Sequence, residues 1–191
     1  MNESQILTNV VSELNNTISR PLSDKDLLRL CDNKANLITH GEIKGYSDVY
    51  ELMGKNKACI ILYVTSSDDG NIFGHWTCVF ESPKDKSIVY FDPYGQQVDY
   101  PLRHMTPRAI EEFGNVPILS EMLEDQIEDG KKVHINHHHL QHHLLNDNVC
   151  GRLTGLRLNF RMLDDEQFFK LMTSENGINS DQLSAILTAE F

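Results

Sequence analysis

The 191-residue sequence has few of the features that would place a protein in a membrane or a secretory pathway. Hydrophobic residues make up 40% of the chain, and they occur in runs too short to form a transmembrane helix. The first residues lack a basic region followed by an apolar core, so we expect no secretory signal. A chain of this length can build one domain with a substantial core.

Basic residues are also scarce. The chain has 17 lysines and arginines against 28 aspartates and glutamates, which gives a formal net charge of −11 at pH 7. Such a surplus of negative charge disfavours broad electrostatic binding to the phosphate backbone of nucleic acids. We therefore expect no nucleic-acid partner. Apart from this charge argument, we expect no membrane partner, and we expect a monomer.

The four cysteines, Cys31, Cys59, Cys78 and Cys150, are spaced neither as a zinc ribbon nor as a CxxC redox pair. Without a secretory signal the expected compartment is reducing, so we expect the four thiols to be free. A free cysteine is usually a small buried apolar residue. The informative cysteine is therefore the one whose neighbours in the sequence are not apolar.

The hydrophobic pattern predicts a single α+β domain over residues 1–191, with a central, mainly antiparallel sheet flanked by helices. Amphipathic spacing predicts a helix over 4–18, and residues 1–20 are a candidate peripheral extension. Apolar runs rich in β-branched residues, separated by turns such as SSDDGN, predict strands at 58–64, 74–80, 88–92 and 132–135. Further helices are expected in PLSDKDLLRLCDN with Ser23 as cap, in YSDVYELMG with Ser47 as cap and Gly54 as stop, in 101–129, and in three segments from Cys150 onward.

A histidine and an aspartate lie at corresponding ends of two neighbouring predicted strands. His75 begins the strand 74–80 and Asp92 ends the strand 88–92, with the turn ESPKDKS about midway between them. In an antiparallel hairpin such residues come near each other at the same end of the sheet. An imidazole oriented by a carboxylate can act as a general base, so His75 and Asp92 are a candidate catalytic pair.

Cys150 is the best candidate for a nucleophile beside this pair. Side chains alternate along a strand, so Cys78 points away from His75, and Cys59 lies inside an apolar run. Cys150 instead follows the polar residues LNDN and precedes Gly151, which leaves room for a substrate carbonyl, at a predicted helix start. A helix N-terminus lowers the pKa of a thiol, and a nearby imidazolium lowers it further. Spacing alone also allows that these residues share no function.

Six of the nine histidines lie in HINHHHLQHHLLNDNVCGR, which runs from His134 to Arg152. If this segment were helical, His138 and His142 would share a face, as would His139 and His143, and such spacing suits metal ligands. The histidine cluster itself, from His134 to His143, contains no acidic or cysteine ligand that would complete a site. We therefore favour a polar segment beside the candidate catalytic residues over a metal centre, and we expect no cofactor.

Four separated motifs resemble those of the adenovirus-type maturation proteases and their relatives, the ubiquitin-like-protein-specific proteases. They are Gly74-His75-Trp76, Phe91-Asp92-Pro93-Tyr94-Gly95, the segment from Asn136 to Gln141, and Cys150-Gly151-Arg152. They occur in the order typical of that superfamily, within residues 22–162. The pattern is most similar to the capsid-maturation proteases of Polinton-like elements, virophages and large DNA viruses. The resemblance implies a papain-like or adenain-like cysteine protease fold with the nucleophile at a helix N-terminus.

The resemblance also implies a role for each matched residue. Cys150 would be the nucleophile and His75 the base, oriented by Asp92. Gln141 would donate its side-chain amide to the oxyanion hole, together with the main-chain N–H of Cys150. Trp76 would line the substrate groove, although it can equally be an ordinary aromatic residue of the sheet.

Two positions depart from the pattern of the resembled families. Gln141 lies nine residues before Cys150, a longer gap than in the adenoviral and ubiquitin-like-protein-specific members. Leu153 and Thr154 stand where many relatives carry an aromatic residue soon after the Cys-Gly pair. The packing behind the nucleophile is therefore expected to differ.

The implied function is that of a viral cysteine endopeptidase, a thiol protease that cleaves capsid or virion precursor proteins next to small residues such as glycine. It would act in the virion and in the host cytoplasm, at the viral factory. Two alternatives stay open: a deconjugating protease for ubiquitin-like modifiers, and an inactive, histidine-rich protein that binds metal or acts as a scaffold. The chain has little beyond a core domain with which to hold a folded modifier, and its intact catalytic-type residues disfavour inactivity.

Overall fold

The computed structural model describes residues 3–142, 148–173 and 177–191, in which five strands form one sheet. The strands, in their order across the sheet, are β1 (Asn36–Thr39), β2 (Ala58–Asp68), β3 (Asn71–Glu81), β4 (Ile88–Phe91) and β5 (Val133–Ile135). The central strands β2, β3 and β4 are antiparallel, whereas β1 and β5 run parallel to their neighbours. The predicted meander is therefore confirmed, but the sheet as a whole is mixed.

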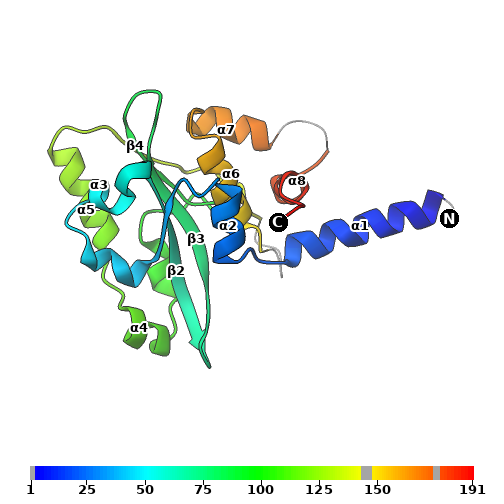
Figure 1. The fold of residues 1–191 in the computed structure, drawn as a ribbon, viewed down its shortest axis with the longest axis horizontal. Coiled ribbons are helices and arrows are strands. Elements are labelled where there is room, and N and C mark those ends of the chain that lie inside the picture. The colour runs from blue at the N-terminus through cyan, green and yellow to red at the C-terminus, as the bar shows by residue number, and fades with distance from the viewer. Residues whose placement is uncertain (1–2, 143–147, 174–176) are drawn as a thin grey trace.

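Helices cover both faces of this sheet, so the molecule has three layers (Figure 1). On one face lie α2 and α6, followed by α7 and α8, and on the other face lie α3 and α5. The helices are α1 (Glu3–Ser19), α2 (Asp24–Leu30), α3 (Val49–Met53), α4 (Pro107–Phe113), α5 (Ile118–Glu128), α6 (Cys150–Asn159), α7 (Asp165–Met172) and α8 (Ser180–Leu187), with 3₁₀ turns η1 (His40–Gly45), η2 (Gly54–Asn56) and η3 (Tyr100–His104). The α+β class predicted from the sequence is confirmed at this level.

Alternation of side chains along β2 and β3 gives each face of the sheet its own hydrophobic core. Ile60 and Cys78 are fully buried in the core beneath α2 and α6. Ile61 and Val79 are fully buried in the core beneath α3 and α5. The central strands read as continuous apolar runs because helices cover both faces.

Local sequence sets the helix starts. Ser23 caps α2 as predicted, since its Oγ accepts a hydrogen bond from the main-chain N–H of Asp26 at 3.3 Å. The predicted cap of α3 is wrong by one residue. Asp48 Oδ1 accepts from the main-chain N–H of Glu51 at 2.8 Å, while Ser47 Oγ donates to the Glu51 carboxylate.

The turn between β2 and β3 is shorter than predicted. Strand pairing continues to Asp68 and Asn71, which leaves only Asp69 and Gly70 at the turn. Both turn residues have positive φ, +44° and +82°, as a tight hairpin turn requires. The two strands therefore form a long hairpin whose end extends past the rest of the sheet (Figure 1).

The strand β4 is much shorter than its neighbour β3, and this difference creates room for a site. β4 ends at Phe91, which pairs with Cys78, so β3 has no β4 neighbour from Asn71 to Thr77. Gly74 lets this part of β3 approach β2 closely, since a Cβ there would be 2.1 Å from the carbonyl oxygen of Tyr63. The predicted catalytic residues gather beside this stretch of β3.

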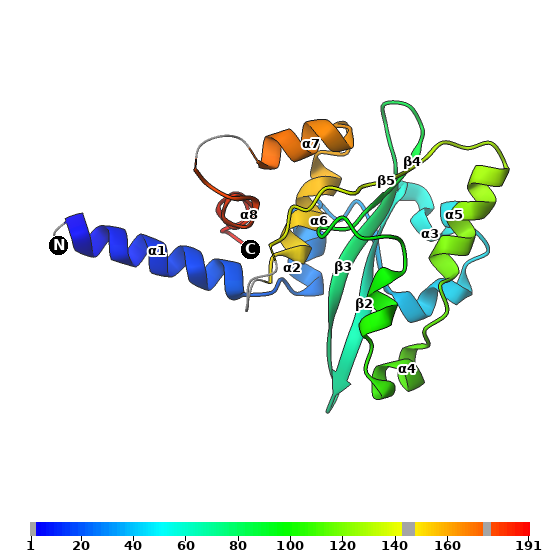
Figure 2. The same cartoon turned by 180° about the vertical axis from the view of Figure 1, so that it is seen from behind.

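The N-terminal helix α1 extends away from the three layers, as both views show (Figures 1 and 2). Ile6, Val10 and Val11 on this helix are each about half exposed. Near the other end of the helix, Ile18 is buried in the core, and the role of residues 1–20 as a peripheral extension stays a prediction. No helix in the described part of the chain is long and apolar enough to span a membrane.

Gly155 provides a test of how closely α6 packs on α2. A Cβ at this position would lie 2.5 Å from Leu30 Cδ2 and 3.1 Å from Leu27 Cδ1. We expect Gly155→Ala to lower the free energy of unfolding by about 1–3 kcal/mol through overpacking, as measured by urea denaturation. The matched control is Gly45→Ala, because a Cβ at Gly45 would meet no atom within 4 Å. Equal stability of the two variants would contradict this packing.

Candidate active site

The predicted nucleophile lies at the start of a buried helix. Cys150 is the first residue of α6 and follows Val149 at the N-cap position. Its thiol is partly buried and contacts the side chain of His75 on β3. The fold thus brings together two residues that lie far apart in the sequence.

A carboxylate also faces the imidazole of His75. Asp92 Oδ1 lies 3.1 Å from His75 Nε2, as an ion-pair contact rather than a well-aligned hydrogen bond, and Asp92 is fully buried. The same oxygen accepts a 2.7 Å hydrogen bond from the main-chain N–H of Tyr94. The Tyr94 ring stacks on the imidazole, with 4.9 Å between ring centres and 23° between planes. Asp92 and Tyr94 together fix the position of His75.

The surroundings of this pair favour a thiolate beside an imidazolium. Burial raises the pKa of the Cys150 thiol, but contacts with His75 and with the main-chain N–H groups of Trp76 and Gly151 outweigh burial and leave the pKa below its usual value. Burial lowers the pKa of His75, but the Asp92 carboxylate and Cys150 outweigh it and raise that pKa to about 10. A thiolate is the reactive form of a cysteine nucleophile.

The other three thiols show the opposite tendency. Burial raises the pKa of Cys31 and of Cys59 to about 12, and it raises the pKa of Cys78 well above the usual range. Cys78 lies in the core beneath α6, as strand alternation predicts. All four cysteines are free, and of the four only Cys150 contacts His75 and has a lowered thiol pKa.

Contacts between α6 and β3 set the position of the nucleophile. Thr154 Oγ1 donates a 3.1 Å hydrogen bond to the main-chain carbonyl of Trp76. Gly151 lies against the Trp76 ring, where a Cβ would be 3.2 Å from Cδ1. Leu153 and Thr154 are both fully buried. A small hydrogen-bonded side chain and a leucine therefore pack behind the nucleophile, where the resembled families often have an aromatic residue.

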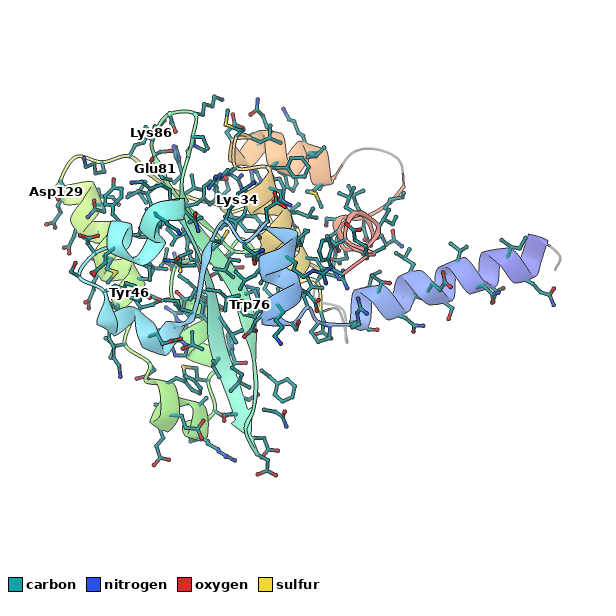
Figure 3. All side chains as sticks on the ribbon, viewed as in Figure 1. Lys34, Tyr46, Trp76, Glu81, Lys86 and Asp129 are labelled. Carbon is teal, nitrogen blue, oxygen red and sulfur yellow. The ribbon has the colours of Figure 1, made fainter. Side chains whose placement is uncertain are left out.

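Trp76 is buried rather than exposed on the surface. Its side chain lies where β3 passes α2 (Figure 3), and the residue is only 7% exposed. Leu22 and Trp76 lie on either side of the space that a Cβ on Gly151 would enter. Trp76 therefore packs beside the nucleophile, and its contact with substrate stays a prediction.

The segment that carries Gln141 is tied to the end of β4. The main-chain N–H groups of Leu140 and Gln141 both donate to the carbonyl of Pro93, at 3.0 and 2.9 Å. Upstream, the Asn136 side chain accepts from the main-chain N–H of Asp92 at 2.7 Å and donates to its carbonyl at 2.9 Å. Figure 2 shows this segment leaving β5 and running toward α6. Gln141 is thus anchored to the same turn that positions the Asp92 carboxylate.

The last helix holds the Gln141 segment from its other side. Asp181, whose side chain is 2% exposed, accepts from the main-chain N–H of His142 at 3.2 Å and lies 2.8 Å from His142 Nδ1. Ser180 Oγ donates to the main-chain carbonyl of Leu140. Since residues 140 and 142 flank Gln141, α8 fixes the backbone on both sides of it. Asp181 could not be predicted as a positioning residue, because its partner His142 lies 39 residues away in the sequence.

Comparison with known proteins places the chain beside a viral protein. It is 30% identical over 172 residues to the uncharacterized protein V9 of Sputnik virophage, in an alignment that covers 87% of this chain and 93% of that protein. The chain belongs to this virophage protein family. No protein-family model matches the chain. The relationship indicates that the protein is of viral origin.

In its described part, residues 134–142, the histidine-rich segment of this virophage-family protein is not helical, so it lacks the helical spacing on which the metal alternative depended. Among the residues outside the undescribed stretches, no three His, Cys, Asp or Glu side chains are grouped as metal ligands. The chain is not helical between His138 and His142, so these two histidines do not share a helical face. His138 stacks on Phe169 with 4.3 Å between ring centres, and its Nε2 lies 3.0 Å from Glu166. The other pair considered, His139 and His143, includes a residue that lies outside the described part of the chain.

The pKa shifts predict how Cys150 reacts with iodoacetamide. Because the thiol pKa is lowered from 9.0, alkylation of Cys150 should remain fast below pH 9, where an ordinary thiol is mostly protonated. His75→Ala removes the contact that opposes burial, so we expect the thiol pKa to rise and the rate at pH 7 to fall by about tenfold or more. Alkylation rates measured by peptide mass spectrometry between pH 5 and 10 test this. A rate that His75→Ala leaves unchanged at pH 7 would show that the two side chains do not interact.

Proposed function

We propose that this protein is a viral cysteine endopeptidase. The observation that carries the proposal is the contact between the Cys150 thiol, at the N-terminus of α6, and the imidazole of His75. The buried Asp92 carboxylate lies 3.1 Å from Nε2 of the same imidazole. Acyl transfer by a thiol requires a nucleophile in contact with a base, and a carboxylate that orients the base. We include in this proposal that the chain has the papain-like or adenain-like cysteine protease fold that the four motifs imply.

The reaction follows from these positions. The Cys150 thiolate attacks the carbonyl carbon of the scissile peptide bond and forms a tetrahedral intermediate. The His75 imidazolium then gives its proton to the departing amine nitrogen, the C–N bond breaks, and a thioester remains on Cys150. Water then attacks the thioester, and neutral His75 accepts a proton from that water. The C–S bond breaks, which releases the acid product and restores the thiolate–imidazolium pair. Asp92 stabilises each imidazolium that forms.

Gln141 is the proposed oxyanion donor, together with the main-chain N–H of Cys150. Negative charge grows on the carbonyl oxygen in the transition state, so a fixed amide donor there lowers the barrier. The support for this role is the rigidity of the Gln141 backbone. Its N–H is bonded to Pro93, and α8 holds both neighbouring residues. The long gap of nine residues to Cys150 is thus compatible with a fixed position for Gln141.

The proposed substrates are capsid or other virion precursor proteins, cleaved next to small residues in the virion or in the host cytoplasm. The viral family of the chain supports a viral substrate. The close packing of Gly151 against Trp76 supports a narrow approach to the nucleophile, because there is no space for even one more carbon atom without movement of the ring. A narrow approach favours glycine and other small residues at the scissile bond.

The test is co-expression of the protein with the major capsid protein of its virus, followed by intact mass measurement of the capsid chain. We expect the wild-type protein to shorten the capsid chain and Cys150→Ala to leave it intact. Cys31→Ala is the matched control, since it removes a thiol that is buried away from His75. Processing that survives Cys150→Ala would overturn the proposal, and turnover of ubiquitin-like conjugates in place of the precursor would favour a deconjugating enzyme.

Gln141→Ala separates the oxyanion role from the nucleophile. Loss of one oxyanion donor costs on the order of 10²–10³ in kcat, so we expect a decrease of that size for cleavage of the precursor junction. Alkylation of Cys150 by iodoacetamide should be unchanged, because the thiol and His75 are both retained. A variant with normal kcat would remove Gln141 from the mechanism.

A further inference from the structure

One edge of β3 is uncovered next to the candidate nucleophile. Pairing with β4 covers β3 only from Cys78 onward, and the residues before it are paired with β2 alone. The first four residues of β3, from Asn71 to Gly74, are all exposed. This stretch of open edge leads directly to His75 and Trp76.

The direction of the main-chain polar groups can be read from bonds that β3 already makes. The N–H of Glu81 donates to the carbonyl of Lys57, and the carbonyl of Phe73 accepts from the side-chain hydroxyl of Thr65 on β2, so odd-numbered residues of β3 face β2. Main-chain groups alternate along a strand, so those of Trp76, Gly74 and Ile72 face the open edge.

The contacts of Trp76 agree with this assignment. Its carbonyl accepts from Thr154 on α6, and its N–H contacts the Cys150 thiol. The catalytic helix therefore occupies the open edge at Trp76. The next two outward-facing residues, Gly74 and Ile72, follow along the same edge.

Two exposed apolar side chains flank this edge. Phe73 is 61% exposed and lies on the same face of β3 as His75, and Ile72 is 41% exposed and lies on the same face as Trp76. Apolar residues on an exposed edge strand are unusual, because such an edge can pair with other chains. Because these two side chains lie beside the candidate nucleophile, they are positioned to pack against apolar side chains of a substrate.

We propose that an extended segment of the substrate polypeptide adds to β3 as a further strand, bonded to the main-chain groups of Ile72 and Gly74 and packed against Phe73. This inference rests on the proposed function and specifies its substrate class: an unfolded, extended segment with apolar side chains, rather than a folded surface. The four residue steps from Ile72 to Trp76 span about 13 Å, so about four substrate residues on one side of the scissile bond lie along the edge.

Proline at position 72 tests the edge without breaking the hairpin. The N–H of Ile72 faces away from β2, so Ile72→Pro removes a donor from the open edge and leaves the bonds to β2 in place. Ile72→Ala is the matched control, because it shortens the side chain but keeps the N–H. With peptides that span the precursor junction, we expect Ile72→Pro to lower kcat/KM by about tenfold and Ile72→Ala to lower it less.

A second measurement uses the wild-type protein and altered peptides, so it holds even if the proline variant folds poorly. Junction peptides shortened by four residues from one end should lose about tenfold in kcat/KM, as should peptides with an N-methyl group at alternate residues on that side. Cys150 alkylation should be normal in both Ile72 variants.

Failure of this inference is distinguishable from failure of the proposed function. If Cys150→Ala abolishes processing but shortened and N-methylated peptides are cleaved as fast as the full peptide, edge pairing is wrong and the endopeptidase stands. If Cys150→Ala leaves processing intact, the proposed function itself is wrong.

Discussion

The site depends on one contact, between a thiol on α6 and an imidazole on β3. It forms because β4 ends opposite Cys78, which leaves the start of β3 open for the N-terminus of α6. His75 is buried and the Cys150 thiol is partly buried, so each charge costs desolvation energy and is stabilised by the other. The Thr154 hydrogen bond to Trp76 fixes the helix at the distance this contact needs.

A chain of polar contacts extends from this pair through the turn after β4 to the end of the chain. Asp92 faces His75, Asn136 holds the main chain of Asp92, and Pro93 accepts from Gln141. Asp181 on α8 then bonds the residue after Gln141. Buried polar groups are costly unless partnered, so this network favours one arrangement of the site over others. The helix α8 thereby helps to position the backbone around Gln141, the proposed oxyanion donor.

The parts of this architecture that could be predicted are those with a local cause. Alternation along strands separated Cys78 from His75, and the polar residues before Cys150 with the glycine after it predicted a helix start. β1 was missed because its four residues pair with a strand that follows only after η1, α3 and η2. The spacing in the histidine segment left helix and loop open, because its backbone is held by the carbonyls of Pro93 and Tyr90, which no local pattern reveals. The role of Asp181 is hidden for the same reason.

The central claim is that Cys150 forms a covalent thioester during cleavage, with His75 as its proton partner. The most direct measurement is to mix the protein with its precursor substrate, quench the reaction in acid within one turnover, and search the digested peptides for an acyl group. The account predicts the acyl mass on the peptide that carries Cys150, and its loss in His75→Ala. Cleavage without a covalent adduct, or an adduct on another residue, would contradict it.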